Sequence, residues 1–265
     1  MQSLFALILV SSPGWAASDE ATLLDWSELG HTQALEDAQA RGPGLLEAGA
    51  DHRLALYDSV RREVVILEDD RPSASFPVHH ASDLLLLDHG VLVLDHSARE
   101  LSLWTFDGAL RAQRRLPELV PTAVTMGLEG DQVLALDIFG HGHPAATLRE
   151  GELQAPAARG LQLRHSPVLW DGATMSTDGL DLSLPDALKA SGQRFGDWLV
   201  VDEVVGDAPI RVTRTAWHIP SHQAHPLPVD GRLYAPQGDL AATPEGELVV
   251  LVPRDEGLEI LRVSP

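Results

Sequence analysis

Cysteine and asparagine are absent from this chain of 265 residues. Without cysteine, neither a disulfide framework nor a cysteine-linked lipid anchor can form. Without asparagine, N-linked glycosylation is excluded. Lysine occurs once, at Lys189, so arginine supplies nearly all of the 19 basic residues. Because Lys and Asn codons are rich in A and T, this shortage is typical of a GC-rich genome and indicates a bacterial protein.

Long apolar runs are also missing. The N-terminal run Leu4–Val10 has seven residues, whereas a membrane-spanning helix needs about 20, so we expect no membrane span. The run has the length of a signal-peptide core, and Gly14 and Ala16 supply the small residues of a cleavage site, although no Lys or Arg precedes the run. We therefore predict a signal peptide over residues 1–17. The mature chain, residues 18–265, is then expected to be a single domain in the periplasm or outside the cell.

Acidic residues outnumber basic ones by 39 to 19, which gives a formal net charge of −20. Affinity for nucleic acid rests on Lys and Arg that neutralise phosphates, so this charge disfavours nucleic acid, and it disfavours anionic lipid surfaces for the same reason. The simplest interpretation of the charge is solubility. The alternative is a partner or ligand that is cationic, including a metal ion.

A strand–turn–strand pattern recurs along the chain. Residues 54–67 and 91–104 each comprise a short apolar stretch that ends in Asp, a polar turn and a second, alternating stretch. The two Asp residues, Asp58 and Asp95, are 37 positions apart (95 − 58). The same shape returns less regularly at three further Asp residues and at one Pro in the Asp position: Asp137, Asp171, Asp202 and Pro253.

The spacing of this pattern predicts the fold. Five intervals cover 195 residues (253 − 58), a mean of 39 (195/5). A four-stranded propeller blade needs about 40–50 residues. The chain is therefore predicted to be all-β, a β-propeller with six blades, with five as the alternative.

The first two repeats resemble NHL-type propeller repeats, in which a strand ends in Asp, a polar turn follows and an amphipathic strand leads to a glycine turn. Residues 91–111 match best, down to a Phe-Asp-Gly turn before the next strand. Where that family usually carries Asn and Arg before the second strand, the first repeat has Arg61 and Glu63. The second repeat has Ala98 and Glu100 there. The resemblance implies a six-bladed propeller that serves mostly as a binding scaffold, with a minority of enzymes among related propellers.

Two helices are predicted within this β pattern. The first, Ser27–Arg41, starts with Ser and is followed by Gly42. The second, Leu184–Ser191, has Pro185 near its start and Gly192 just beyond its end.

The last blade lacks residues for its outer strand. Its second and third strands are predicted at Glu247–Val252 and Leu258–Val263, close to the C-terminus. An open sheet edge there would invite aggregation. We therefore predict that Ala21–Leu29 adds the outer strand and joins the two ends of the propeller. If a helix begins at Ser27, only Ala21–Trp26 would pair.

Propeller geometry predicts where the repeated Asp residues lie. If strands a to d of each blade run outward from the centre, the b–c turns and the d–a crossovers share one rim. An Asp at the end of a b strand is expected to hydrogen-bond the backbone of its turn. The residues predicted in this position are Asp58, Asp95, Asp137 and Asp202.

Histidine is frequent, with 12 residues, and several lie near these Asp residues. Neutral imidazole is the commonest metal ligand, so a divalent metal is a candidate cofactor, although each histidine alone is more simply a solvated loop residue. The candidates for a ligand-binding rim are His79, His80, Asp95, His96, Asp137, His141, His143, His222 and His225. The candidates for a metal site, if they converge, are His96, His141, His143 and His225.

The motifs of several enzyme classes do not occur. The chain has no GxSxG nucleophile elbow, Walker phosphate loop, GxGxxG dinucleotide fingerprint or HExxH metal motif. The predicted inner strands offer mostly apolar and small residues, whereas a propeller enzyme needs carboxylates at the channel ends of these strands. We therefore expect an exported, non-enzymatic propeller that binds a protein or small ligand on one rim. The alternatives are a metal-dependent propeller hydrolase or lactonase, and a structural component of an envelope complex.

Overall fold

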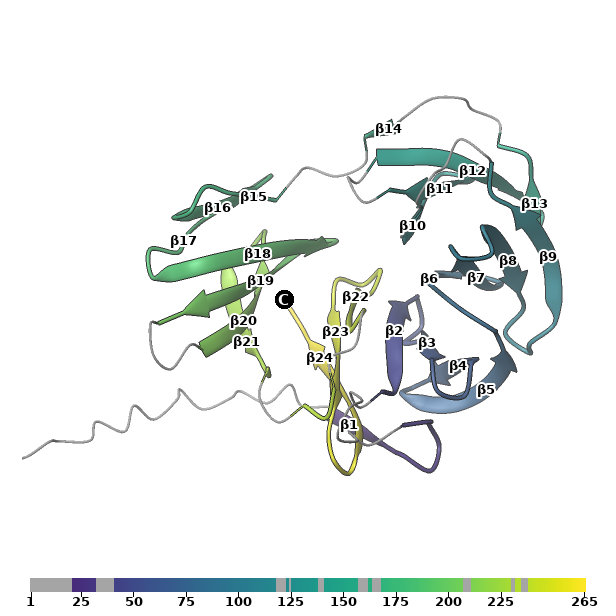
Figure 1. Cartoon of the computed structure of the whole chain (residues 1–265), viewed down its shortest axis with the longest axis horizontal. Coiled ribbons are helices and arrows are strands. Elements are labelled where there is room, and N and C mark those ends of the chain that lie inside the picture. The colour runs from purple at the N-terminus through teal and green to yellow at the C-terminus, as the bar shows by residue number, and fades with distance from the viewer. Residues whose placement is uncertain are drawn as a thin grey trace, which may run out of the picture.

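The computed structural model describes residues 21–31, 41–117, 123, 125–137, 141–156, 162–163, 168–206, 211–229, 232–234 and 238–265. Within these residues the chain is all β, and its strands form six antiparallel sheets. The sheets are arranged around a common centre as the blades of a propeller, so six blades rather than five are present (Figure 1). The predicted signal peptide, residues 1–17, lies outside the described residues.

The first three blades each have four antiparallel strands in order from the centre outward, and blade 3 has a fifth, short strand. Blade 1 contains β2 (Pro43–Ala48), β3 (Leu54–Asp58), β4 (Glu63–Glu68) and β5 (Arg71–Pro77). Blade 2 contains β6 (Asp83–Leu87), β7 (Gly90–Asp95), β8 (Glu100–Trp104) and β9 (Leu110–Arg115). Blade 3 contains β10 (Thr125–Glu129), β11 (Gln132–Leu136), β12 (His141–Arg149) and β13 (Glu152–Gln154), and β14 (Gln162–Leu163) also pairs with β12.

The second half of the propeller is less regular. Blade 4 has three described strands, β15 (Leu169–Trp170), β16 (Thr174–Thr177) and β17 (Leu180–Ser183). Blade 5 contains β18 (Ala187–Phe195), β19 (Trp198–Val205), β20 (Arg211–His218) and β21 (Gln223–Leu227). Blade 6 contains β22 (Leu240–Ala242), β23 (Leu248–Pro253), β24 (Gly257–Val263) and, from the other end of the chain, β1 (Ala21–Asp25).

The innermost strands of neighbouring blades lie side by side. β2 contacts β22 and β6, β6 contacts β10, and β18 contacts β22 and β15. Between blades 6 and 1, Leu45 and Gly238 form a parallel bridge, and the Gly238 amide donates a hydrogen bond to the Gly44 carbonyl at 2.6 Å. Successive inner strands therefore run in the same direction, and corresponding turns of all blades meet on the same rim.

The hydrophobic core lies between the blades. Leu56 and Leu251 belong to the cluster between blades 1 and 6, and Val64 and Val93 to the cluster between blades 1 and 2. Further clusters join blade 2 to blade 3, blade 4 to blade 5, and blade 5 to blade 6. Because b strands are covered on both faces, β3 is buried along its whole length, which explains the continuous apolar stretches in the sequence.

The recurring Asp residues close the b–c turns, as expected. Asp58 ends β3 and accepts hydrogen bonds from two turn amides at 2.9 and 3.0 Å. Asp95 ends β7 and accepts one from the Ala98 amide at 2.9 Å. Asp137 follows β11 and accepts one from the His141 amide at 3.0 Å. In these three blades the repeat in the sequence is therefore a repeat of turn chemistry.

One of the predicted strand ends is wrong. Asp202 lies inside β19, opposite Arg214 of β20, because β19 continues to Val205. Asp171, in contrast, follows β15, the first described strand of blade 4, and closes the turn to β16 as a strand-end Asp is expected to do. β18 and β19 of blade 5 are longer than the first two strands of blades 1 and 2, so Asp202 does not mark a strand end.

β1 supplies the outer strand of blade 6, which confirms the predicted closure. It pairs antiparallel with β24, with Leu23 opposite Glu259. Leu24 of β1, and Trp26 and Leu29 after it, are buried in the cluster between blades 6 and 1. The chain thus closes its ring by pairing its first described strand with its last.

Neither helix prediction holds in the described residues. Most of Leu184–Ser191 belongs to β18, which pairs with β19 along its length, and this pairing outweighs the local helix signals at the two ends. The described part of Ser27–Arg41 is a turn in which the Glu28 amide donates to the Asp25 carbonyl at 3.0 Å, and residues 32–40 lie outside the described residues. In the part of the chain that the structure describes, no helix is long and apolar enough to span a membrane.

Candidate ligand-binding groove

Several predicted rim residues form a group in blade 2, on the rim of the b–c turns. His80 Nδ1 lies 3.3 Å from Asp95 Oδ1, and the His80 and His96 rings meet edge-on with centroids 5.7 Å apart. His96 Nδ1 is 2.7 Å from the Ser82 hydroxyl oxygen. His79 is exposed next to this group in the chain.

A second group lies on the same rim in blade 3. His141 Nδ1 and His143 Nε2 each lie 3.3 Å from Asp137 Oδ2. The structure therefore brings the predicted residues of blades 2 and 3 together in two small Asp–His groups, one in each blade.

The remaining two histidines lie elsewhere. His222 is in the turn from β20 to β21, a c–d turn on the opposite rim, and His225 on β21 packs edge-on against Trp198 with centroids 5.4 Å apart. Burial lowers the pKa of His225, and the neighbouring His218 lowers it further. Because His225 lies in blade 5, it does not converge with the three other metal candidates, which lie in blades 2 and 3. Among the described residues, no group of three or more His, Cys, Asp or Glu could hold a metal ion.

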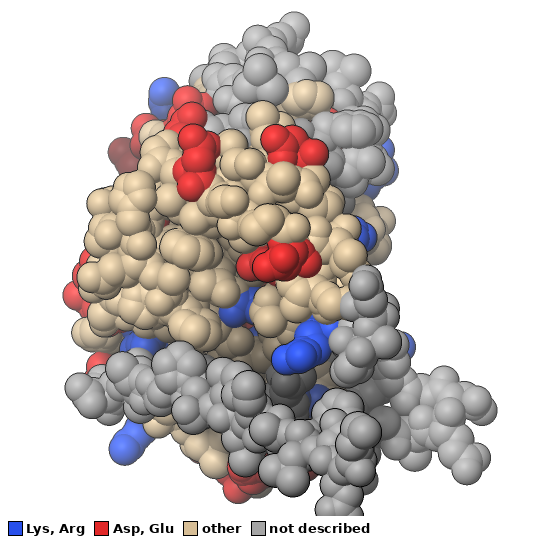
Figure 2. Space-filling view, turned by 90° about the vertical axis from the view of Figure 1, so that its left-hand side faces the viewer, with Lys and Arg blue, Asp and Glu red and all other residues tan. Residues whose placement is uncertain are grey.

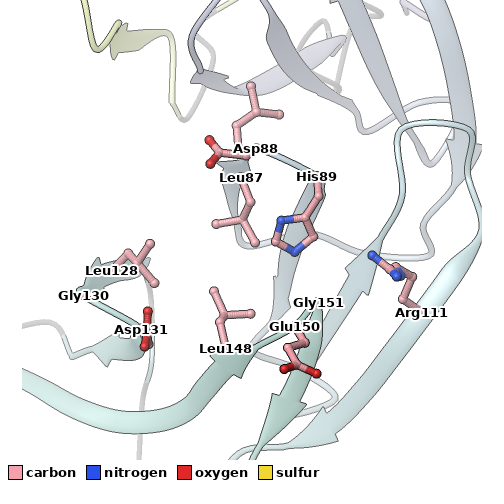
Figure 3. A pocket seen from close by; sticks show the side chains of 11 residues that line it. Leu87, Asp88, His89, Arg111, Leu128, Gly130, Asp131, Leu148, Glu150 and Gly151 are labelled. Carbon is pink, nitrogen blue, oxygen red and sulfur yellow. The ribbon is translucent and has the colours of Figure 1, made fainter.

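The rim of the a–b and c–d turns carries a groove of about 520 Å³ between blades 2 and 3 (Figure 3). Its apolar surface comes from strand ends. Leu86 and Leu87 end β6, Leu128 lies near the end of β10, and Leu148 near the end of β12. All four leucines are partly exposed, because the strands stop here and the neighbouring blade no longer covers them.

Two-residue turns place charged side chains around these leucines. Asp88 and His89 join β6 to β7, and Asp131 lies in the turn from β10 to β11. Glu150 and Gly151 join β12 to β13 with φ angles of 51° and 77°, the combination of a type I′ turn. The three carboxylates are exposed.

The charges of the groove are unpaired. In the part of the chain that the structure describes, the side chains of Asp88, Asp131 and Glu150 make no ion pair or hydrogen bond. Arg111 of β9, the basic residue among those lining the groove, also has no partner there. Three acidic side chains and one basic side chain leave the groove with a net negative charge at neutral pH.

A smaller cavity beside β18 and β22, of about 190 Å³, differs from the groove because its charged side chains are paired. Arg214 in its wall donates to Asp202 at 2.6 and 3.1 Å and to Asp239 at 2.5 Å. Asp239 also accepts a hydrogen bond from Arg232 at 2.6 Å. The charges of this cavity thus neutralise one another. On the side that faces left in Figure 1 and includes blade 5, acidic and basic side chains form small groups within a largely uncharged surface (Figure 2).

Two carboxylates on inner strands link neighbouring blades. Asp83 of β6 accepts a hydrogen bond from the Met126 amide of blade 3 at 2.5 Å, and the Leu86 amide of blade 2 interacts with the Glu47 carboxylate of β2. Burial, and secondly the charge of Asp83, raise the pKa of Glu47 to about 8. Burial likewise raises the pKa of Asp83 to about 7. Each carboxylate thus interacts with an amide of the next inner strand, and the prediction of apolar inner strands missed both of them.

Replacing Glu47 by glutamine is expected to flatten the decline of stability with rising pH. The Glu47 pKa is 4.5 in an unperturbed chain and about 8 in the folded protein, so between these values the folded state holds the proton more tightly. The contribution of Glu47 to the free energy of unfolding is therefore fully present below pH 4.5. It is lost as the pH rises toward 8, by at most about 1.4 kcal/mol per pH unit. Urea unfolding of wild type and Glu47→Gln between about pH 5 and about pH 8 measures the difference.

The control for this experiment is Glu245→Gln, which removes an exposed carboxylate from blade 6. This variant should lose stability with pH as the wild type does. If Glu47→Gln also follows the wild type, the folded-state proton is not on Glu47.

The groove was not predicted from the sequence, because most of the predicted site residues are histidines on the opposite rim. The signal that could have found it is an acidic residue in each of three two-residue turns: Asp88, Asp131 and Glu150. An acidic residue in a hairpin turn is common, however, and only the packing of blade 2 on blade 3 brings the three together.

No protein-family model matches this chain, and no curated protein matches its sequence. Among solved structures, a catalytically inactive virginiamycin B lyase from Staphylococcus aureus with quinupristin is 8% identical, with a TM-score of 0.48, covering 92% of this chain and 100% of its own. A streptogramin B lyase is 10% identical, with a TM-score of 0.43, covering 88% and 96%. BamB from Moraxella catarrhalis is 12% identical, with a TM-score of 0.36, covering 92% and 76%. Such likenesses concern the fold alone, and none shows the NHL type of repeat.

Proposed function

We propose that the protein is an exported, non-enzymatic propeller that binds a ligand in the groove between blades 2 and 3. The ligand carries a cationic group next to an apolar part, as a basic segment of a partner protein or a small amphiphilic cation does. The observation that supports this best is the set of three unpaired carboxylates around four partly exposed leucines. Export is supported by the signal-like composition of residues 1–17.

The two kinds of lining residue act on different parts of the ligand. Asp88 and Asp131 attract a cation and set its position, and the excess of negative charge over the whole chain steers it toward the protein. Contact with the leucines removes apolar surface from water, which adds roughly 25 cal/mol per Å² buried. Binding in this mode needs no nucleophile, general base or bound metal.

Neutralising Asp88 and Asp131 of the groove is expected to weaken binding of a cationic peptide at least about tenfold, or about 1.4 kcal/mol. The probe is the amide-capped peptide Ac-Arg-Ala-Leu-NH2, and its neutral counterpart is Ac-Gln-Ala-Leu-NH2. Calorimetric titration at low salt should show that wild type prefers the first, and that Asp88→Asn/Asp131→Asn loses the preference. The preference should also fade with added salt.

The matched control is Asp255→Asn/Glu256→Gln, which removes two exposed carboxylates from the turn between β23 and β24 of blade 6. It reduces the negative charge by the same amount and should bind as the wild type does. Equal weakening by both double variants would mean that only the overall charge attracts the peptide. The groove would then not be the binding site.

A further inference from the structure

We infer that the groove takes a ligand with a carboxylate at its outer end, such as the C-terminus of a short peptide, and that Arg111 recognises this carboxylate. The inference rests on the proposed function and adds to it the chemical class of the ligand: a zwitterion with its cation toward the centre of the propeller, an apolar middle and its anion toward the outside.

The charges of the groove are separated along the blades. Asp88 and Asp131 lie in turns that follow the innermost strands β6 and β10, whereas Arg111 lies on β9, the outermost strand of blade 2. Figure 3 shows Arg111 and Asp131 on opposite sides, with His89, Leu148 and Glu150 between them. Three strand spacings of about 4.8 Å separate β6 from β9, which gives about 14 Å between the two ends of the groove.

Arg111 lies against the β12–β13 turn, at the outer end of the groove, without an acceptor. A Cβ atom at position 151 would lie 2.7 Å from Arg111 Nη1, so the glycine lets the guanidinium lie directly against the β12–β13 turn. Glu150 in the same turn makes no ion pair with Arg111 in the described residues. The planar guanidinium therefore keeps its donors for a ligand, and its fork matches a carboxylate with two parallel hydrogen bonds.

A purely cationic ligand does not account for Arg111, because the guanidinium would repel it. A free amino acid is too short to reach both ends. Three extended residues cover about 10 Å, and a basic side chain at the first residue adds the remaining reach. A peptide of about three residues with a basic first residue, an apolar last residue and a free carboxylate thus meets the acidic end, the leucines and Arg111 together.

The test compares Ac-Arg-Ala-Leu with a free C-terminal carboxylate and the same peptide as its C-terminal amide, by calorimetric titration. We expect wild type to bind the acid at least about fivefold more tightly than the amide. Arg111→Gln should bind acid and amide equally. Arg111→Lys should retain part of the preference, because it keeps the charge and loses the fork. Arg115→Gln, four residues along the same exposed strand, should behave as wild type.

The outcomes separate the two proposals. If wild type binds acid and amide equally, or if Arg111→Gln keeps the preference, the recognition of a carboxylate by Arg111 is refuted while the cation-binding groove stands. If wild type binds neither peptide, the proposed function fails, and this inference fails with it. Thermal melting of the Arg111 variants shows that they are folded, as expected for an exposed side chain.

Discussion

Replacing Arg262 by methionine should lower the free energy of unfolding by about 3–5 kcal/mol, because it leaves a buried carboxylate without its partner. Arg262 lies on β24 of blade 6, and Asp70 in the turn before β5 of blade 1. The guanidinium donates to the Asp70 carboxylate at 2.7 and 3.1 Å and to Glu247 at 3.1 Å. Arg262 and Asp70 are both 6% exposed, so water cannot replace the lost partner.

Urea unfolding measures this loss, and two further variants test its cause. Arg53→Met breaks the ion pair with Glu68, whose side chain is 52% exposed, and should cost less than about 1 kcal/mol. Arg262→Met combined with Asp70→Leu removes both buried charges and should recover most of the stability. If the double variant is no more stable than Arg262→Met, the loss comes from packing rather than from the unpaired carboxylate.

Deleting residues 21–29 should abolish the cooperative unfolding transition or lower its midpoint by more than about 10 °C. The deletion exposes the edge of β24 and removes the buried side chains of Leu24, Trp26 and Leu29. Burying one such side chain stabilises a core by roughly 2–5 kcal/mol, so the three together are comparable with the whole stability of a typical domain. The Trp26 indole also donates to the Arg254 carbonyl at 3.0 Å, which the deletion leaves without this bond.

Differential scanning calorimetry of the two chains gives the comparison. Leu23→Ala, at a residue of the same strand that is 52% exposed, is the control and should change the midpoint by a few degrees at most. A synthetic peptide of residues 18–31 added to the shortened chain should restore part of the stability. A shortened chain that melts as the full one does would show that β1 does not hold the ring closed.

The fold could be predicted because its local chemistry repeats. Asp58, Asp95 and Asp137 each close a b–c turn by accepting a backbone hydrogen bond, and the strands before them are apolar because both of their faces are buried. The closure followed from the same reasoning, since an unpaired edge is costly and one stretch of the chain could cover it.

The predictions failed where a distant strand decides the local structure. Leu184–Ser191 has helix signals at both ends, yet most of it pairs with β19, and a helix there would leave the β19 backbone at Asp202–Val205 without this partner strand. Asp202 has the sequence context of a turn residue, but Arg214 across the sheet holds it inside a long strand.

The candidate site shows the same division more clearly. The six-fold repeat, the pairing of the two chain ends and the acidic character of the chain could be derived from its residues, because each depends on residue type and spacing alone. Which charges meet, in contrast, depends on how the blades pack. Asp88, Asp131 and Arg111 come from three turns or strands in two blades, and their spacing in the chain carries no information about the groove they line. The packing of one blade on the next pairs some charges, as it does for Arg262 and Asp70, and leaves others facing water.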